Sequence, residues 1–497
     1  MTIVGSADVP YVRREVRPEP VDVSAEVPKV NRRAALRSLE SARTYAEWRE
    51  AALAYDRARG LDGWRALEAC PLYDHALVRR RLEELVALRR SGDDHGLLFA
   101  LNEGIHGNLG GMGREDLYLQ SAFGTKQLII DYVDAVVEAL HHLAEDADPT
   151  IPEAQKQDFF RRARICYGHT ALMLSGSGSF FFFHIGVLRA LVSEGLLPSV
   201  LSGSSGGALV AATLGTRPPE QWDSVLSVEH FHPFVLERER ARPDANTSLR
   251  RKVLERNQQI LEELIPDLTF EEAYRVSGLN INISVAPTDL HQSSRLLNAI
   301  TSPHVFVREA VAASCALPGV FPPVTLMAKT FEGDKRPYLP DRRWIDGSLS
   351  DDLPAKRLSR LFGVNHYIVS QTNPHVLPFL TDEKLSRSSL GVLLHTGQRT
   401  LREWMNGGAA VLQRPLRASP QVYRAVHTFL SIINQDYLGD INVLPPRGTV
   451  NPFNLLAFRS QKDAQSLVQS GERATWPKIE MVRNQTKISR TLDRLVG

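Results

Sequence analysis

Apolar residues recur every three or four positions between residues 31 and 165, a period typical of amphipathic helices. In the stretch SARTYAEWREAALAYDRARG this period places Tyr45, Trp48 and Ala52 on one face. Residues 1–30 show no such period and are rich in Pro, Val and charge. The pattern therefore predicts a flexible N-terminal tail over 1–30 and an N-terminal helical domain over 31–165.

The period changes near residue 166, where short apolar runs begin to alternate with helical stretches. The four clearest runs are ALMLS, PSVLSGSS, LNINISVAP and NHYIVSQTN. Strands that alternate with helices favour a mostly parallel sheet covered by helices on both faces. We therefore expect an α/β domain over residues 166–375, with a charged, largely helical insert at about 217–275. Residues 376–497 return to a helical, Arg-rich pattern, and the last forty are expected to form a solvated helix.

The composition of the 497-residue chain argues against several classes of protein. It is 43% hydrophobic and 23% charged, as expected for a globular protein with two or three domains. A net charge of +2 argues against a dedicated nucleic-acid-binding protein. Cys70, Cys166 and Cys315 lie too far apart in sequence for a CxxC pair, so neither a structural zinc site nor a disulfide framework is expected. A reducing, cytoplasmic environment is favoured.

Membrane contact is expected to be peripheral. The start of the chain lacks the apolar core of a signal peptide, and no window reaches about 18 uninterrupted apolar residues. Two stretches mix arginine with apolar side chains, as interfacial segments do: FHPFVLERERARPDANTSLRRKVLERN and GQRTLREWMNGGAAVLQRPLRA. Both are candidate contacts with a lipid surface, although a charge run is more often only a solvated face.

A glycine- and serine-rich turn follows the first predicted strand, in ALMLSGSGSFFFFHIGVLRAL. A phosphate-binding P-loop would need a Lys followed by Ser or Thr after its glycines, but Phe180–Phe183 stand there. A dinucleotide-binding turn would need a third glycine, which is replaced by Phe181, and an acidic residue at the end of the next strand, which ends in Ser. Neither phosphate-binding motif fits this turn.

The second predicted strand leads into SVLSGSSGGALVAATLG, which contains the G-x-S-x-G pattern of a nucleophile elbow. The five residues are Gly203, Ser204, Ser205, Gly206 and Gly207. Small neighbours permit the tight turn that exposes the central serine at the edge of the sheet. The helix that follows has its positive end at this turn, which favours developing negative charge. The motif predicts that Ser205 is a nucleophile, and a plain Gly/Ser turn is the alternative.

The first turn then gains a role in acyl chemistry. Backbone N–H groups of Gly176, Ser177, Gly178 and Ser179 are expected to point at the carbonyl oxygen that becomes anionic when the serine attacks. Glycine there lets the substrate approach the backbone closely. A plain strand-to-helix turn is the alternative. His184, just inside the next helix, is expected to be a buried or capping residue.

A serine nucleophile needs a base, and the segment RRWIDGSLSDDLPAKRLSRLFGVNHYIVSQTNPH offers two kinds. Asp346 lies in a turn after a short apolar stretch and is followed by Gly347 and Ser348. His366 and His375 would instead complete a Ser–Asp–His order, although a structural role is the commoner one for either histidine. The residues alone leave both kinds of base open.

Four blocks of the chain together resemble the patatin-like phospholipases: SGSGSFFFFHIGVLRAL, LSGSSGGALVA, AVAASCALPGVFPPV and WIDGSLSDDLPAKRLSRLFGVNHYIVSQTNPH. Within that family the chain is most similar to the triacylglycerol lipases of yeasts and plants, which also carry an N-terminal helical region. The resemblance runs in order from Tyr45 to Pro446. It implies a patatin-like three-layer α/β/α fold with a mostly parallel central sheet, preceded by an α-helical N-terminal domain and followed by a helical C-terminal region.

The resemblance also implies a Ser–Asp dyad, in which Ser205 is the nucleophile and Asp346 is the base. The turn from Gly176 to Phe181 would form the oxyanion hole, although Ser177 and Phe181 stand where the family usually has glycine. Either side chain is tolerated if its backbone φ is negative. No metal and no cofactor are implied.

The implied activity is hydrolysis of lipid esters, most directly triacylglycerol, at the surface of a membrane or lipid droplet with which a cytoplasmic protein associates peripherally. Nucleic acid is not an implied partner, and a homo-oligomer is an open alternative. Phospholipase A activity and lysophospholipid acyltransferase or transacylase activity on the same site are the competing hypotheses. A non-catalytic scaffold at a lipid surface is a further one, weakened by the joint presence of the serine, the aspartate and the glycine turn.

Overall fold

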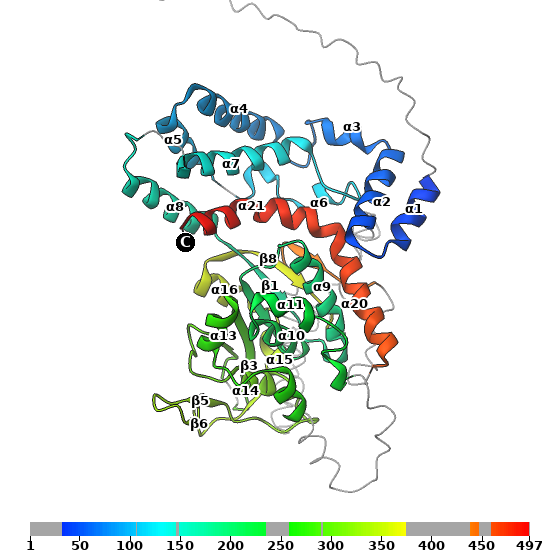
Figure 1. Cartoon of the computed structure of the whole chain (residues 1–497), viewed down its shortest axis with the longest axis vertical. Coiled ribbons are helices and arrows are strands. Elements are labelled where there is room, and N and C mark those ends of the chain that lie inside the picture. The colour runs from blue at the N-terminus through cyan, green and yellow to red at the C-terminus, as the bar shows by residue number, and fades with distance from the viewer. Residues whose placement is uncertain are drawn as a thin grey trace, which may run out of the picture.

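The computed structural model describes residues 32–105, 107–145, 149–234, 258–289, 292–373, 438–446 and 459–496. These residues form a layer of N-terminal helices above a unit built around a β-sheet (Figure 1). The C-terminal helix α21 (Ile479–Val496) lies between the two parts. The chain is therefore divided into a helical part and a strand-containing part, as the change in hydrophobic period near residue 166 indicates.

The N-terminal part has helices as its regular structure, as predicted. They are α1 (Arg32–Ser41), α2 (Tyr45–Ala58), α3 (Leu61–Ala66), α4 (His75–Ser91), α5 (Asp94–Gly104), α6 (Glu115–Tyr118), α7 (Gln127–Glu145) and α8 (Glu153–Tyr167). Thr44 caps α2 by accepting a hydrogen bond from the Glu47 N–H, and Trp48 and Ala52 of the predicted face are buried. Helix α7 buries the most apolar residues of this part and forms its centre.

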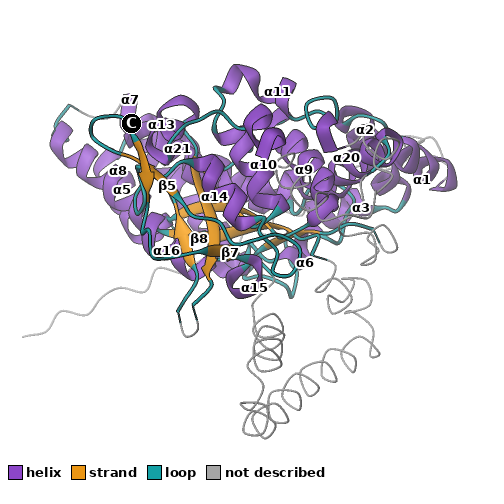
Figure 2. Cartoon of the chain, turned by 90° about the horizontal axis from the view of Figure 1, so that it is seen from below, coloured by secondary structure: helices purple, strands orange, loops and turns teal. Residues whose placement is uncertain are grey.

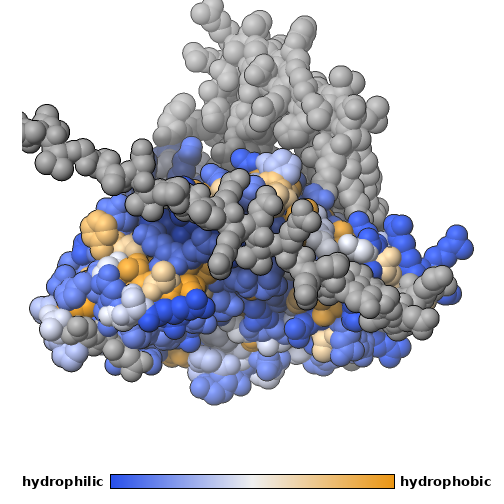
Figure 3. Space-filling model, turned by 90° about the horizontal axis from the view of Figure 1, so that it is seen from above, coloured by the Kyte–Doolittle hydropathy of each residue, from blue (hydrophilic) through white to orange (hydrophobic). Residues whose placement is uncertain are grey.

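The outer face of this part is mostly hydrophilic, with one larger hydrophobic area and scattered apolar residues (Figure 3). Leu67 is 59% exposed and Phe99 is 67% exposed, and both belong to the N-terminal part. Individual exposed apolar side chains are ordinary in globular proteins. The predominance of hydrophilic residues on this face indicates that the helices turn their apolar stripes inward.

The central sheet is mostly parallel, as expected. Among the described residues, five parallel strands follow the order β3-β2-β1-β8-β9, and β4 and β7 pair antiparallel with β3. Their bounds are β1 (His169–Leu174), β2 (Val200–Gly203), β3 (Asn280–Pro287), β4 (Arg295–Leu297), β7 (Trp344–Asp346), β8 (Val364–Ser370) and β9 (Ile441–Val443). A separate hairpin is formed by β5 (Met327–Lys329) and β6 (Lys335–Pro337).

Helices cover both faces of the sheet. They are α9 (Phe181–Ser193), α10 (Gly206–Gly215), α11 (Trp222–Val225), α13 (Phe270–Ser277), α14 (Val307–Ser314), α15 (Ser348–Asp351) and α16 (Ala355–Phe362). Figure 2 shows α9, α10 and α14 on one side of the strands. Along β1, Leu172 and Leu174 belong to the large core that includes α9 and α10, whereas Ala171 and Met173 pack with Leu358 of α16. Side chains of a strand alternate between faces, so this division confirms the three-layer arrangement.

The expectation of a solvated helix at the C-terminal end is wrong. Helix α20 (Gln461–Thr475) packs on α9, and α21 packs on α7 and α8. A Cβ on Gly186 of α9 or on Gly471 of α20 would overlap a carbonyl oxygen of the other helix, so the two backbones nearly touch. Helix α21 buries polar residues such as Asn484 and Thr491, which is why its pattern resembles that of a solvated helix. The segment after residue 376 also contributes β9, a strand that the sequence analysis does not expect.

None of the helices in the described ranges is long and apolar enough to cross a membrane. Of the two Arg-rich stretches considered for lipid contact, the one at 397–418 lies outside the described residues. So does the other from residue 235 onward, and Phe231 at its start is buried. Lipid contact by these stretches therefore stays a prediction.

Candidate active site

Ser205 stands between β2 and α10 with φ 51° and ψ −120°, a backbone conformation that residues other than glycine rarely adopt. Such a strained turn persists only where its surroundings hold it, and it is typical of functional sites. The Ser205 N–H donates a hydrogen bond to Ser314 Oγ at 2.9 Å. The Ser205 side chain is partly exposed, so a substrate has access to it. The structure thus has the strand–turn–helix arrangement that the sequence predicts.

The glycines of the elbow are required by close backbone contacts. A Cβ on Gly207 would overlap the carbonyl oxygen of Leu174 at the end of β1. A Cβ on Gly206 would overlap Ser177 Oγ, and one on Gly203 would crowd the Gly207 carbonyl. The turn from β2 into α10 therefore packs directly against the turn that follows β1, which brings the two predicted motifs together.

Asp346 ends β7 and lies against Ser205. Its carboxyl accepts a hydrogen bond from the Ser348 N–H at 2.8 Å, and the Ser205 side chain lies close enough to influence its charge. Burial raises the pKa of Asp346 from 3.8 to about 6, and the interactions with Ser348 and Ser205 oppose that rise. The carboxylate is therefore ionised at neutral pH and is a stronger proton acceptor than an exposed aspartate.

Strand pairing explains why two residues 141 positions apart meet. Strand β2 pairs with β3, with Gly203 opposite Ile283, and β7 pairs with β3, with Asp346 opposite Val285. A Cβ on Gly347 would overlap the Ser284 carbonyl, so the turn after Asp346 fits closely against β3. Strand β3 is thus the common neighbour that places the serine and the aspartate at one edge of the sheet.

The turn after β1 contains four predicted donors, and one of them is engaged elsewhere. The Gly176 N–H donates to Asp352 Oδ1 at 2.7 Å, so the expectation that this N–H faces a substrate is wrong. The N–H groups of Ser177 and Gly178 make no hydrogen bond with the described residues. Ser179 Oγ accepts a hydrogen bond from Arg459 Nε at 3.1 Å. Gly178 takes φ 50°, which glycine adopts without strain.

Asp352 is a functional candidate that the sequence analysis did not identify. It is fully buried, its Oδ2 accepts a hydrogen bond from Asn373 Nδ2 at 3.3 Å, and its carbonyl oxygen accepts one from Ser204 Oγ at 3.1 Å. Together with the bond to Gly176 this links both turns of the site. Burial raises the pKa of Asp352 to about 7, and the charge of Asp346 adds to the rise. The only sequence signal is the acidic pair Asp351–Asp352 in DGSLSDDLP, and such a pair is typical of an exposed turn.

His184 is buried, as expected, and lies against the start of the turn that follows β1. Its Nδ1 lies 2.7 Å from Ser370 Oγ, and its Nε2 lies 3.1 Å from both the Ser175 carbonyl and Thr372 Oγ1. Burial lowers the pKa of His184 to about 4, so the ring is neutral at neutral pH. A neutral ring that donates from Nε2 to the Ser175 carbonyl fixes the end of β1 where the turn begins.

A Ser–His–Asp arrangement through His366 is wrong, because this histidine lies at the opposite end of the sheet. His366 pairs with Thr170 at the start of β1, whereas the elbow packs against Leu174 at its end, about 13 Å away along the strand. Its Nδ1 lies 3.0 Å from Thr170 Oγ1, and its Nε2 lies 2.8 Å from Gln485 Oε1. His375 lies outside the described residues.

The phenylalanine run lines the start of α9 beside the site. Phe181 stacks on Phe182 with ring centroids 4.3 Å apart and contacts Phe231 and Phe234 at 5.4 and 5.2 Å. Phe181 has φ −56° and Ser177 has φ −138°, so neither departure from glycine strains the backbone. An aromatic wall thus stands next to the turn that follows β1.

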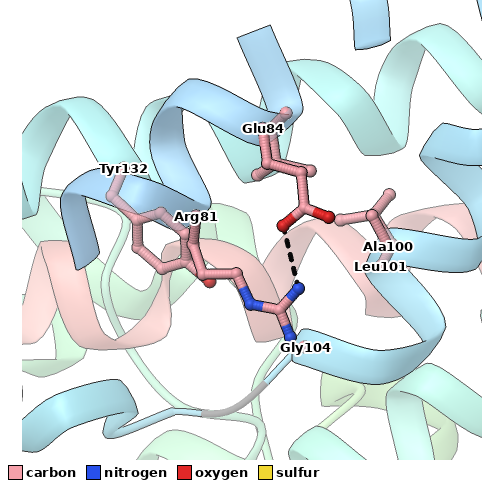
Figure 4. A pocket seen from close by; sticks show the side chains of 7 residues that line it. Arg81, Glu84, Ala100, Leu101, Gly104 and Tyr132 are labelled. Carbon is pink, nitrogen blue, oxygen red and sulfur yellow. Dashed lines mark hydrogen bonds and ion pairs between the residues drawn. The ribbon is translucent and has the colours of Figure 1, made fainter. Parts of the chain in front are cut away.

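A shallow pocket lies in the N-terminal part, away from this chemistry. Its lining includes Arg81, Glu84, Leu101 and Tyr132, and the first two form an ion pair at 3.0 Å (Figure 4). All of its lining residues come from α4, α5 and α7. It is therefore separate from the Ser205 site.

Comparison with known proteins agrees with the fold and the motifs. A family model described as patatin-like phospholipase matches residues 172–358. A triacylglycerol lipase of Schizosaccharomyces pombe is 32% identical over 470 residues, which cover 90% of this chain and 94% of that protein. The chain belongs to the patatin-like phospholipase family. The N-terminal helices of this patatin-like chain match a second model over residues 27–165, described as a domain of unknown function (DUF3336).

Two further relatives extend well beyond the matched region. A patatin-like phospholipase domain-containing protein of Cryptococcus neoformans is 33% identical over 484 residues, covering 92% of this chain and 54% of that protein. A triacylglycerol lipase of Arabidopsis thaliana is 31% identical over 481 residues, covering 92% of this chain and 58% of that protein. The chain thus spans a little over half the length of these two relatives.

Proposed function

We propose that this chain is a serine lipid acyl hydrolase, most directly a triacylglycerol lipase, in which Ser205 and Asp346 form a catalytic dyad. The observation that carries the proposal is a buried carboxyl, that of Asp346, close beside the side chain of Ser205 at a strained strand–turn–helix elbow. The relatives named triacylglycerol lipase support the substrate class.

In the first half-reaction, Ser205 Oγ attacks the ester carbonyl carbon while the Asp346 carboxylate takes the hydroxyl proton. The tetrahedral intermediate collapses as the bond between the carbonyl carbon and the glyceride oxygen breaks. Asp346 returns its proton to that oxygen, and the glyceride alcohol leaves. The acyl group stays on Ser205 as an ester.

The negative charge on the carbonyl oxygen is stabilised by the turn after β1. The N–H groups of Ser177 and Gly178 are the donors available there, and Asp352 keeps that turn in place through Gly176. The N-terminus of α10, which begins at Gly206, adds a favourable partial positive charge. Loss of one such donor typically costs about 10²–10³ in rate.

In the second half-reaction, water attacks the acyl-enzyme while Asp346 takes its proton. The fatty acid leaves and Ser205 regains its proton from Asp346. A lipid alcohol in the place of water would transfer the acyl group instead, by the same proton movements. The substrate is held at a lipid surface with which the chain associates peripherally.

The test is release of fatty acid from emulsified triacylglycerol and, in parallel, from phospholipid vesicles. Wild type is compared with Ser205→Ala and Asp346→Asn, with circular dichroism as the check of folding. We expect activity on triacylglycerol that both substitutions reduce by at least about 10³-fold. Activity on phospholipid alone would change the substrate class and keep the dyad. Folded wild type inactive on both lipids would contradict the proposal.

A further inference from the structure

Helix α14 ends beside the nucleophile. Its last residue, Ser314, is fully buried, and its Oγ accepts a hydrogen bond from the Ser205 N–H at 2.9 Å. The same hydroxyl donates to the Ser284 carbonyl of β3 at 2.8 Å. Its proton is thereby committed to β3, so a lone pair faces Ser205. Ser314 thus ties the strained elbow to the centre of the sheet.

The residue two positions further along the chain contacts the base. The Ala316 carbonyl accepts a hydrogen bond from the Asp346 N–H at 3.1 Å. Short-range hydrogen bonds keep the segment itself compact: the Cys315 N–H donates to Val311 at 2.9 Å and the Ala316 N–H to Ala313 at 3.1 Å. One short, ordered segment therefore holds the backbone of both Ser205 and Asp346.

Cys315 stands between these two anchors, and its thiol lies near the Ser205 hydroxyl. Burial, together with the Asp346 carboxylate, raises the pKa of the Cys315 thiol to about 12. The thiol stays protonated and does not compete as a nucleophile. The position of Cys315 thus places residues 314–316 close to Ser205 Oγ.

We propose that Ser314 is a positioning residue for the nucleophile, and that residues 314–316 set the distance between Ser205 and Asp346. The inference rests on the proposed dyad. A serine at φ 51° is held there only by its surroundings. Without the Ser314 hydroxyl, the Ser205 N–H loses its acceptor and the elbow relaxes. A displacement of the reacting groups by about 1 Å is enough to cost about 10²-fold in rate.

The chain offers a matched control in Ser277. It is also a buried serine at the last position of an eight-residue helix, α13. Its hydroxyl donates to the Ala273 carbonyl at 2.9 Å and accepts from the Leu279 N–H at 3.0 Å. Ser277→Ala, like Ser314→Ala, removes one donated and one accepted hydrogen bond of a buried serine, but Ser277 does not contact the dyad.

The experiment measures kcat and KM for ester hydrolysis, with melting temperature, for wild type, Ser314→Ala and Ser277→Ala. We expect kcat to fall about 10- to 100-fold in Ser314→Ala with KM within twofold, because the change acts on the reacting groups. Ser277→Ala should lose comparable thermal stability and keep its kcat. Ser314→Thr, which keeps the hydroxyl, should retain more activity than Ser314→Ala.

A kcat of Ser314→Ala within twofold of wild type would overturn the proposal, as would an equal loss in Ser277→Ala. Should Ser314→Ala not fold, Ser314→Cys fills a similar volume with a weak acceptor and carries the same expectation. A wild type without Ser205-dependent activity would instead contradict the proposed dyad itself. The two failures are thus distinguishable.

Discussion

In the proposed dyad, a carboxylate takes the part that an imidazole has in a Ser–His–Asp site, and two features of its surroundings favour this role. Burial raises the pKa of Asp346 to about 6, near the range in which a general base is most useful. The neighbouring Asp352, with a pKa raised to about 7, holds the Gly176 N–H and so the oxyanion turn. Asp346 takes up a proton only when it is ionised, and an ionised Asp352 accepts the Gly176 N–H more strongly than a protonated one.

The rate of ester hydrolysis should therefore decrease as the pH is lowered below neutral. Both carboxyls have pKa values above their ordinary range, so lowering the pH protonates them in the folded enzyme. We expect kcat to decrease as the pH falls through the region set by Asp346, about 6, and Asp352, about 7, rather than near the pKa of about 3.9 of an exposed aspartate. The measurement is kcat against pH on a neutral ester, with folding checked at each pH. Full activity retained below pH 5 would contradict this assignment.

Residues at the site differ in how far the sequence predicts them. The residue pattern alone predicts Ser205 as a nucleophile, whereas Asp346 is singled out as the base only by the resemblance to the patatin-like phospholipases. Ser314 and Asp352 lie within two of the blocks that carry the resemblance, but nothing in either block indicates their roles, because their partners are the backbone of Ser205 and of Gly176, far away in the chain. Only the packing of α14 and of the turn after β7 reveals them.

At the scale of elements, the position of the turn after β1 depends on how α9 packs against its neighbours. Helix α9 carries His184 and the phenylalanine run, and it packs on α20 where Gly186 and Gly471 face each other. The sequence predicts α9, but it does not predict α20 as its neighbour. A contact between helices almost 300 residues apart leaves no period in the sequence.

Gly186→Ala should therefore destabilise the fold. Its new Cβ would overlap the Val468 carbonyl oxygen, and backbone cannot move aside as a flexible side chain does. Overpacking of this kind costs about 1–3 kcal/mol or more. The control is Gly63→Ala in α3, where a Cβ meets nothing within 4 Å and alanine should stabilise the helix by about 1 kcal/mol. Urea denaturation compares the two, and equal stability of Gly186→Ala and wild type would contradict the close crossing.

At the scale of the whole molecule, α21 joins the N-terminal helices to the sheet, between which it lies in Figure 1. Gln485 of α21 donates to the Gly113 carbonyl at 2.7 Å and lies 2.8 Å from His366 Nε2 on β8. Lys487 of α21 adds an ion pair to Asp134 at 2.5 Å, and Lys478, directly before α21, adds one to Glu115 at 2.8 Å. Buried polar side chains make this helix look solvated in the sequence, so its bridging role could not be predicted.

His366→Leu should thus affect stability and leave catalysis intact. The substitution removes the hydrogen bonds to the half-buried Thr170 and Gln485, and a typical hydrogen bond contributes about 0.5–1.5 kcal/mol to stability. We expect kcat within twofold of wild type at a temperature where the variant is folded. The exposed His304, changed to leucine, is the control and should lose little stability. A loss of kcat as large as that in Ser205→Ala would contradict this prediction and indicate that His366 takes part in catalysis.

The central claim is that Ser205 is a nucleophile activated by Asp346. The most direct measurement is the rate at which a fluorophosphonate probe labels the protein, with peptide mass spectrometry to locate the adduct. We expect one adduct, on Ser205, with labelling slowed at least about 10²-fold in Asp346→Asn and unchanged in His366→Leu. Labelling at another residue, or an undiminished rate in folded Asp346→Asn, would contradict the account.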